Sequence, residues 1–154
     1  MTSSTKHGLI RITSGGQTGA DQGGLEAAEA LGIYTMGLMP KGFKTERGPM
    51  PEVAKRFNLS EHDSPAYPPR TEMNVKICEG TVLFGNMASP GSVLTVSLCK
   101  QWKKPYICNP VEGDLLVFIE ENAITTLNVA GNRESREPGI QARVKAYLIK
   151  ELSS

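Results

Sequence analysis

A glycine-rich stretch near the N-terminus, residues 14–21 (Ser-Gly-Gly-Gln-Thr-Gly-Ala-Asp), constrains the fold of this chain more than any other feature. It follows a short apolar run at residues 9–12 and precedes a helical pattern of apolar residues at Leu25, Ala28 and Leu31. Glycines at such a strand-to-helix turn let backbone N–H groups approach a ligand closely, and the N-terminus of the following helix favours negative charge. The stretch therefore predicts an anion-binding turn, although a tight turn without a ligand would use glycine in the same way.

Two common phosphate-binding motifs do not fit this turn. Neither Gly15 nor Gly16 begins the Gly-x-x-x-x-Gly-Lys-Ser/Thr pattern of a Walker A loop, which argues against ATP hydrolysis of the P-loop type. The dinucleotide fingerprint needs Gly-x-Gly-x-x-Gly and a carboxylate at the end of the second strand, which here ends in Leu38-Met39-Pro40. No residue is therefore placed to hold the ribose hydroxyls of NAD.

Composition and charge limit the class of protein. A chain of 154 residues predicts a single domain over 1–154, with a flexible tail at 1–7. Seventeen Lys and Arg against 16 Asp and Glu create no long-range field, so we expect no nucleic-acid partner. No run reaches the roughly 18 apolar residues of a membrane span, and no secretion signal is present, so we expect no membrane partner and a cytoplasmic location.

The residues that commonly bind metals are scattered. Cys78, Cys99 and Cys108 are odd in number and widely spaced, which argues against a disulfide framework and against a zinc site. His7 falls in the expected tail and His62 in a loop, and neither lies near a cysteine or a second histidine. We therefore expect no metal ligands.

Strand-like and helix-like segments alternate along the chain. We expect strands at about residues 9–13, 33–38, 81–84, 105–108 and 126–129, and helices at about 20–31, 71–78, 93–98, 111–122 and 140–152. Because right-handed crossovers are nearly obligatory, this alternation predicts an α/β fold, a doubly wound, mostly parallel sheet with helices on both faces.

A proline-rich segment interrupts the alternation. We expect residues 39–71 to form a long ordered loop with a short helix near 52–57, and such loops often serve as functional lids or interfaces. Thr71 would cap the helix that follows.

Polar turns follow the first, third and fifth predicted strands, and in a parallel sheet they meet at one edge. If the strand order is 3-2-1-4-5 or a close variant, the first two of these turns lie on either side of the point where the strand order reverses. The third turn then approaches this point from the side. Their backbone donors, hydroxyls and guanidinium suit an oxyanion such as phosphate. The residues concerned are Gly15, Gly16, Thr18, Gly19, Gly91, Ser92, Thr95, Arg133 and Ser135.

Three acidic residues each have a functional and a purely structural interpretation. Asp21 is either a ligand contact or a helix first-turn charge favoured by the dipole. Glu72 and Glu134 each lie within two residues of an arginine and would form exposed ion pairs if they are not functional. We expect Trp102 to serve packing or a subunit contact.

Several motifs, in this order, resemble the molybdenum cofactor carrier proteins, from about residue 10 to 150. They are Gly15-Gly16-Gln17-Thr18-Gly19-Ala20-Asp21, Pro40-Lys41-Gly42, Arg70-Thr71-Glu72-x-Asn74-Val75, Gly80-Thr81 and Leu127-Asn128-Val129-Ala130-Gly131-Asn132-Arg133-Glu134-Ser135. The resemblance implies a Rossmann-like fold related to the lysine-decarboxylase-like phosphoribohydrolases. It also implies homo-oligomers, tetramers in the characterised algal members, and a non-catalytic role in which the protein binds the cofactor, protects it and passes it to apo-enzymes.

The resemblance and the polar turns together predict the binding residues. The expected ligand is an anionic small molecule, the molybdenum cofactor as cargo, or else a molybdate or phosphate oxyanion. The expected cofactor-binding residues are Gly15, Gly16, Gln17, Thr18, Gly19, Asp21, Lys41, Arg70, Gly91, Ser92, Thr95, Asn128, Gly131, Arg133, Glu134 and Ser135.

Two alternatives use the same turns. The related phosphoribohydrolases carry a Pro-Gly-Gly-x-Gly-Thr-x-x-Glu motif whose glutamate assists glycosidic cleavage, and the corresponding residues 90–97 here contain no carboxylate. N-glycosidic hydrolysis would therefore have to recruit Asp21, Glu72 or Glu134. The other alternative is a nucleotide or ADP-ribose sensor without turnover.

Overall fold

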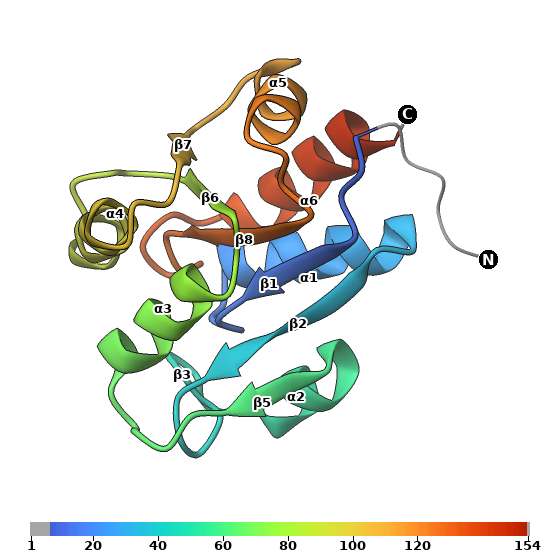
Figure 1. Ribbon diagram of the computed structural model, residues 1–154. Coiled ribbons are helices and arrows are strands. Elements are labelled where there is room, and N and C mark those ends of the chain that lie inside the picture. The colour runs from blue at the N-terminus through green and yellow to red at the C-terminus, as the bar shows by residue number, and fades with distance from the viewer. Residues whose placement is uncertain (1–6, 154) are drawn as a thin grey trace.

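A computed structural model describes residues 7–153 and contains one six-stranded sheet in which all paired strands are parallel (Figure 1). The strands lie in the order β5-β2-β1-β8-β6-β7. Their bounds are β1 (Arg11–Ser14), β2 (Tyr34–Met39), β5 (Leu59–Glu61), β6 (Gly80–Phe84), β7 (Tyr106–Cys108) and β8 (Thr126–Gly131).

Helices cover both faces of this sheet, so the predicted Rossmann-like α/β fold is confirmed. Helices α1 and α6 pack against each other on one face, where α2 and α5 also lie, and α3 and α4 pack together on the other face. The bounds are α1 (Ala20–Leu31), α2 (Pro51–Phe57), α3 (Tyr67–Lys76), α4 (Pro90–Gln101), α5 (Asp114–Glu121) and α6 (Ile140–Leu152). None of the helices within residues 7–153 has the length and apolar character needed to cross a membrane.

The two faces of the central strands differ in chemistry. Side chains alternate along a strand, so Ile12 and its neighbour Leu127 face α1 and α6, where they join the main hydrophobic core. The next pair in register, Thr13 and Asn128, faces α3 and α4, and Asn128 donates a 3.3 Å hydrogen bond to Thr81 Oγ1 on β6. The interior below α3 and α4 is therefore partly polar.

The strand order differs from the expected one. Strand β8, the last in the chain, lies between β1 and β6, whereas the sequence predicted it at the side. The order of strands depends on long-range packing that the local pattern does not carry. As a consequence, the turn after β8 is central and borders the turns after both β1 and β6.

The segment predicted as one long loop contains more structure than expected. It holds β5, which pairs with β2, and a hairpin of two-residue strands, β3 (Lys44–Thr45) and β4 (Gly48–Pro49). The short helix α2 is close to its predicted position.

The start of α3 and the N-terminal segment also differ from prediction. Helix α3 begins at Tyr67 with prolines in its first turn, where their missing N–H groups are tolerated, and Thr71 lies inside the helix and donates to the Tyr67 carbonyl rather than capping. Residues 1–6 of the predicted tail lie outside the described residues. His7 is partly buried, and its Nε2 lies 3.1 Å from the Leu152 carbonyl oxygen.

Candidate functional site

A cavity of about 720 Å³ lies at the carboxyl edge of the sheet. The turns after β1, β8 and β6 border it on one side, and the first turns of α3 and α4 border it on the other. Its position agrees with the rule that open parallel sheets bind ligands beyond the carboxyl ends of their strands. The cavity is the candidate functional site.

Arg70 of α3 is the most unusual side chain of this cavity. The residue is only 8% exposed, its Nε has no hydrogen-bond partner, and no hydrogen bond from its guanidinium to another residue of 7–153 is found. Burial lowers the pKa of Arg70, and nearby Arg133 acts in the same direction, while Asp21 and Tyr67 oppose them. Burying a guanidinium whose donors form no hydrogen bonds is unfavourable in free energy unless an anion accepts those hydrogen bonds.

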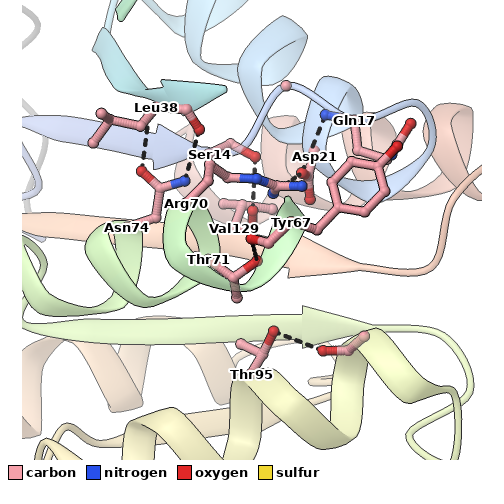
Figure 2. Close-up of polar contacts among 12 residues, drawn as sticks. Ser14, Gln17, Asp21, Leu38, Tyr67, Arg70, Thr71, Asn74, Thr95 and Val129 are labelled. Carbon is pink, nitrogen blue, oxygen red and sulfur yellow. Dashed lines mark hydrogen bonds and ion pairs between the residues drawn. The ribbon is translucent and has the colours of Figure 1, made fainter. Parts of the chain in front are cut away.

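Two features of the fold place Arg70 in the cavity, and Figure 2 shows the first of them, the contact of Asn74 with Leu38. Four residues further along α3, on the same helix face, Asn74 bonds the backbone of β2 at Leu38, accepting from its N–H at 3.0 Å and donating to its carbonyl at 3.1 Å. On the other side, Gly15 leaves room for the guanidinium, because a Cβ there would overlap Arg70 Nη1. The conformation of Arg70 is thus set by α3, β2 and the glycine turn.

Asp21 lies beside Arg70 in the first turn of α1. Its Oδ2 is 3.7 Å from Arg70 Nη1, an ion pair too long for a hydrogen bond, and it accepts a 3.2 Å bond from the Gln17 N–H. Asp21 is 5% exposed, and burial raises its pKa to about 6, against the lowering effect of Arg70 and of the bonds from Gln17, Gly15 and Ser14. This carboxyl group therefore changes its charge close to neutral pH.

Cations gather around one aromatic ring at the cavity. The ring centre of Tyr67 lies 5.0 Å from Lys44 Nζ, 5.3 Å from the guanidinium carbon of Arg70 and 5.7 Å from that of Arg133. Arg133 and Arg136 line the cavity, and among its lining residues Asp21 is the single carboxylate. The site is therefore net positive, as an anion-binding site requires.

The turns after β8 and β6 are tied together by Asn132. Its Nδ2 donates a 2.8 Å bond to Ser89 Oγ, and its Oδ1 accepts from the Asn86 N–H. These bonds hold the start of α4, where Gly91 and Thr95 line the cavity and Thr95 Oγ1 donates to the Gly91 carbonyl. The adjacent Ser92 hydroxyl is buried without a partner within residues 7–153.

Glu46, at the tip of the β3–β4 hairpin, is held at the border of this site. Its carboxylate accepts hydrogen bonds from the hydroxyls of Thr18 and Ser135 and, at 3.2 Å, from the Ser135 N–H. Its own N–H donates to Gln17 Oε1 at 2.9 Å. Burial by itself would raise the pKa of Glu46, but the bonds from Ser135 and Thr18 and the charge of Arg133 outweigh burial and lower it.

The structure brings seven of the residues predicted from the sequence together in the cavity lining. They are Gln17, Asp21, Arg70, Gly91, Thr95, Gly131 and Arg133.

The other predicted residues do not line the cavity. Thr18 and Ser135 bind Glu46, Gly15 packs against Arg70, and a Cβ on Gly16 or Gly19 would crowd Met39 or the Asn132 backbone respectively. Glu134 accepts from the Gly139 and Gln141 N–H groups at the start of α6. Asn128 is inside the sheet, Ser92 is buried in α4, and the Lys41 side chain is exposed.

Sequence reasoning missed several lining residues, chiefly Tyr67, Asn132 and Arg136. Arg136 carried a signal, since it follows the polar turn that contains Arg133. Tyr67 carried none, because the sequence placed it in a loop before the helix.

Glu72 and Trp102 contact each other away from the cavity. Glu72 accepts a 2.9 Å hydrogen bond from Trp102 Nε1, and neither residue lines the cavity.

The residue types that commonly bind metals are not clustered. Burial raises the pKa of the Cys78 thiol to about 12, which disfavours the thiolate. Within residues 7–153 no three His, Cys, Asp or Glu side chains lie close enough together to hold a metal ion.

The fold and the cavity define a Rossmann-like α/β protein with a cavity lined by cationic side chains at the carboxyl edge of its sheet. The chain belongs to the circularly permutated YpsA SLOG family, whose sequence model matches residues 12–152.

A solved structure is also similar to the chain. It is a crystal structure of a "putative molybdenum carrier protein" from Syntrophus aciditrophicus SB, with a TM-score of 0.84 and 30% sequence identity over 96% of each chain. No curated protein matches the chain.

Proposed function

We propose that the cavity binds the molybdenum cofactor through its phosphate, and that the protein is a non-catalytic carrier that protects this cargo and passes it to apo-enzymes. The observation that carries the proposal is the buried guanidinium of Arg70, a cavity-lining residue whose donors form no hydrogen bond with another residue of 7–153. A phosphate oxygen would accept charge-assisted hydrogen bonds from such a group and would offset the free energy of burying it.

The size and the chemistry of the cavity support this ligand. Its volume of about 720 Å³ falls in the range of small-molecule sites. The cofactor is a pterin that bears a phosphate and an oxo-metal centre, and both groups accept hydrogen bonds from guanidinium groups such as those of Arg70, Arg133 and Arg136. The name of the similar Syntrophus protein points to the same class of cargo. In line with the sequence resemblance, we also propose a cytoplasmic homo-oligomer, a tetramer.

Anaerobic co-elution tests the proposal. The purified protein is mixed with freshly released molybdenum cofactor and passed over a sizing column, and the fluorescence of the oxidised pterin is read in the protein peak. We expect stoichiometric pterin with the wild type and with Lys41→Met, which removes an exposed cation outside the cavity lining. We expect none with Arg70→Met. Folded wild-type protein without pterin would overturn the cofactor assignment, and the same run gives the oligomer size.

Asp21 supports a second candidate, a phosphoribohydrolase-like enzyme. Of the three carboxylates that the sequence allowed for N-glycosidic cleavage, Glu72 bonds Trp102 and Glu134 bonds the start of α6, whereas Asp21 lines the cavity. Burial raises the pKa of Asp21 to about 6, which suits a general acid. Incubation with AMP should then release adenine and ribose phosphate, and Asp21→Asn should abolish the release. Binding of AMP without release would instead favour a nucleotide sensor.

A further inference from the structure

Three hydrogen-bond donors converge on the Glu46 carboxylate beside the cavity. They are the Thr18 hydroxyl from the turn after β1, and the hydroxyl and N–H of Ser135 from the turn after β8. Such a set, two hydroxyls and one backbone N–H on a single anionic group, is the kind of donor set that proteins use to bind oxyanions. The cluster formed by Thr18, Ser135 and the nearby Arg133 therefore has the chemistry of an anion site, and a side chain of the protein fills it.

This donor cluster is continuous with the cavity. Gln17 lines the cavity and accepts the Glu46 N–H, and Arg133 lines the cavity while its charge acts on Glu46. Arg133 forms no ion pair within 4.0 Å with any residue between 7 and 153. The guanidinium carbons of Arg70 and Arg133 both lie within 6 Å of the centre of the Tyr67 ring, so one small ligand can reach both.

Glu46 sits at the tip of a hairpin that lies outside the six-stranded sheet. Its hairpin consists of the two-residue strands β3 and β4, which pair only with each other and not with the six-stranded sheet. An isolated hairpin of this size has little stability of its own. The contacts of Glu46 with Thr18, Ser135 and Gln17 therefore help to hold the hairpin against the two turns.

We propose that Thr18, Ser135 and Arg133 form a second oxyanion subsite, which the Glu46 carboxylate occupies in this structure and which an anionic group of the ligand takes over. This inference rests on the proposed function of the cavity and specifies its ligand class, a small molecule with two separated anionic groups. One group binds at Arg70 and the other replaces Glu46. A ligand with a single anionic group gains nothing from the second subsite.

Titration by two-dimensional ¹H–¹⁵N NMR tests this inference, with orthophosphate and tripolyphosphate as probes at constant ionic strength. The variants are Glu46→Ala, Glu46→Gln and the control Glu120→Gln, which removes an exposed carboxylate from α5. Removing the competing carboxylate should strengthen tripolyphosphate binding about tenfold and orthophosphate binding much less. The control should change neither affinity by more than about twofold. In the wild type, the Glu46 and Ser135 amide signals should shift with tripolyphosphate.

The outcomes separate this inference from the proposed function. If both probes bind in a way that Arg70→Met abolishes, but the preference for tripolyphosphate is the same in wild type and both Glu46 variants, the second subsite is overturned and the cavity site stands. If neither probe shifts any signal of the cavity residues in the wild type or in Glu46→Ala, the anion-binding function itself is overturned, and the second subsite with it. Melting temperatures of all variants show whether they are folded.

Discussion

Arg70 Nη1 lies 3.7 Å from Asp21 Oδ2, so two buried, oppositely charged side chains face each other without a hydrogen bond between them. A buried pair with such loose geometry is a poor source of stability, because desolvation of both charges offsets their attraction. The pair leaves the Arg70 donors free for a third group.

The first prediction separates binding from stability at this pair. Arg70→Met removes the guanidinium and should weaken phosphate or pterin binding about 100-fold, the loss of about two charge-assisted hydrogen bonds. The single variant also leaves the Asp21 carboxylate buried and unpaired, so its free energy of unfolding at neutral pH should fall. The double variant Arg70→Met/Asp21→Asn should recover that stability but not the binding. Recovery of binding in the double variant would show that Arg70 is not part of the binding site.

The second prediction concerns pH. Burial raises the Asp21 pKa from 3.8 to about 6, so the folded protein holds more protons than the unfolded chain between these values. The free energy of unfolding contributed by this group is therefore fully present below about pH 4 and is lost as the pH rises through about 6. Relative to Asp21→Asn, the wild type should lose up to about 3 kcal/mol between these limits. Urea unfolding of both proteins at about pH 4 and pH 7.5 measures the difference; a pH-independent difference would contradict it.

The third prediction concerns Asn74, which is 2% exposed and joins α3 to the backbone of β2. Asn74→Ala leaves the Leu38 N–H and carbonyl without these partners and should lower the free energy of unfolding by about 2 kcal/mol. Because Arg70 lies one turn away on the same face of α3, anion affinity should fall as well. The control Asn122→Ala, which removes the hydrogen bond of an exposed residue at the end of α5, should change stability by less than about 0.5 kcal/mol and leave binding intact. Unaltered binding in a destabilised Asn74→Ala would show that α3 does not need this anchor.

The fourth prediction contrasts two glycines at the cavity. Gly15→Ala places a Cβ where Arg70 Nη1 lies and should displace the guanidinium, so anion binding should fall about tenfold or more. At Gly91, in the first turn of α4, a Cβ would meet no atom of the protein within 4 Å. Gly91→Ala should therefore leave the Arg70 guanidinium in place and raise stability by about 0.5 kcal/mol. Binding titrations and thermal unfolding of the two variants check this contrast, and an unchanged affinity in Gly15→Ala would show that Gly15 does not set the position of Arg70.

Much of the fold could be predicted because its signals are local. The glycine turn at 14–21 marked the passage from β1 to α1, apolar periodicity marked the helices, and the alternation of both elements predicted a parallel sheet with two covered faces. The apolar run at residues 115–119, which was expected in a helix at about 111–122, lies in α5. Each of these signals acts between residues within one or two turns of each other.

The strand order and the composition of the site were decided only in the tertiary structure. Strand β8 pairs with β1 and β6 although about 115 and 47 residues separate the partners in the chain, and no local pattern records such a pairing. That placement makes the turn after β8 central and brings Arg133 within reach of Tyr67 and Glu46. The sequence by itself determined five of the six strands of the main sheet, the helices and the turns that are polar. The packing of distant elements decided which of those polar groups share one cavity, because burial and charge pairing depend on neighbours that only the folded chain supplies.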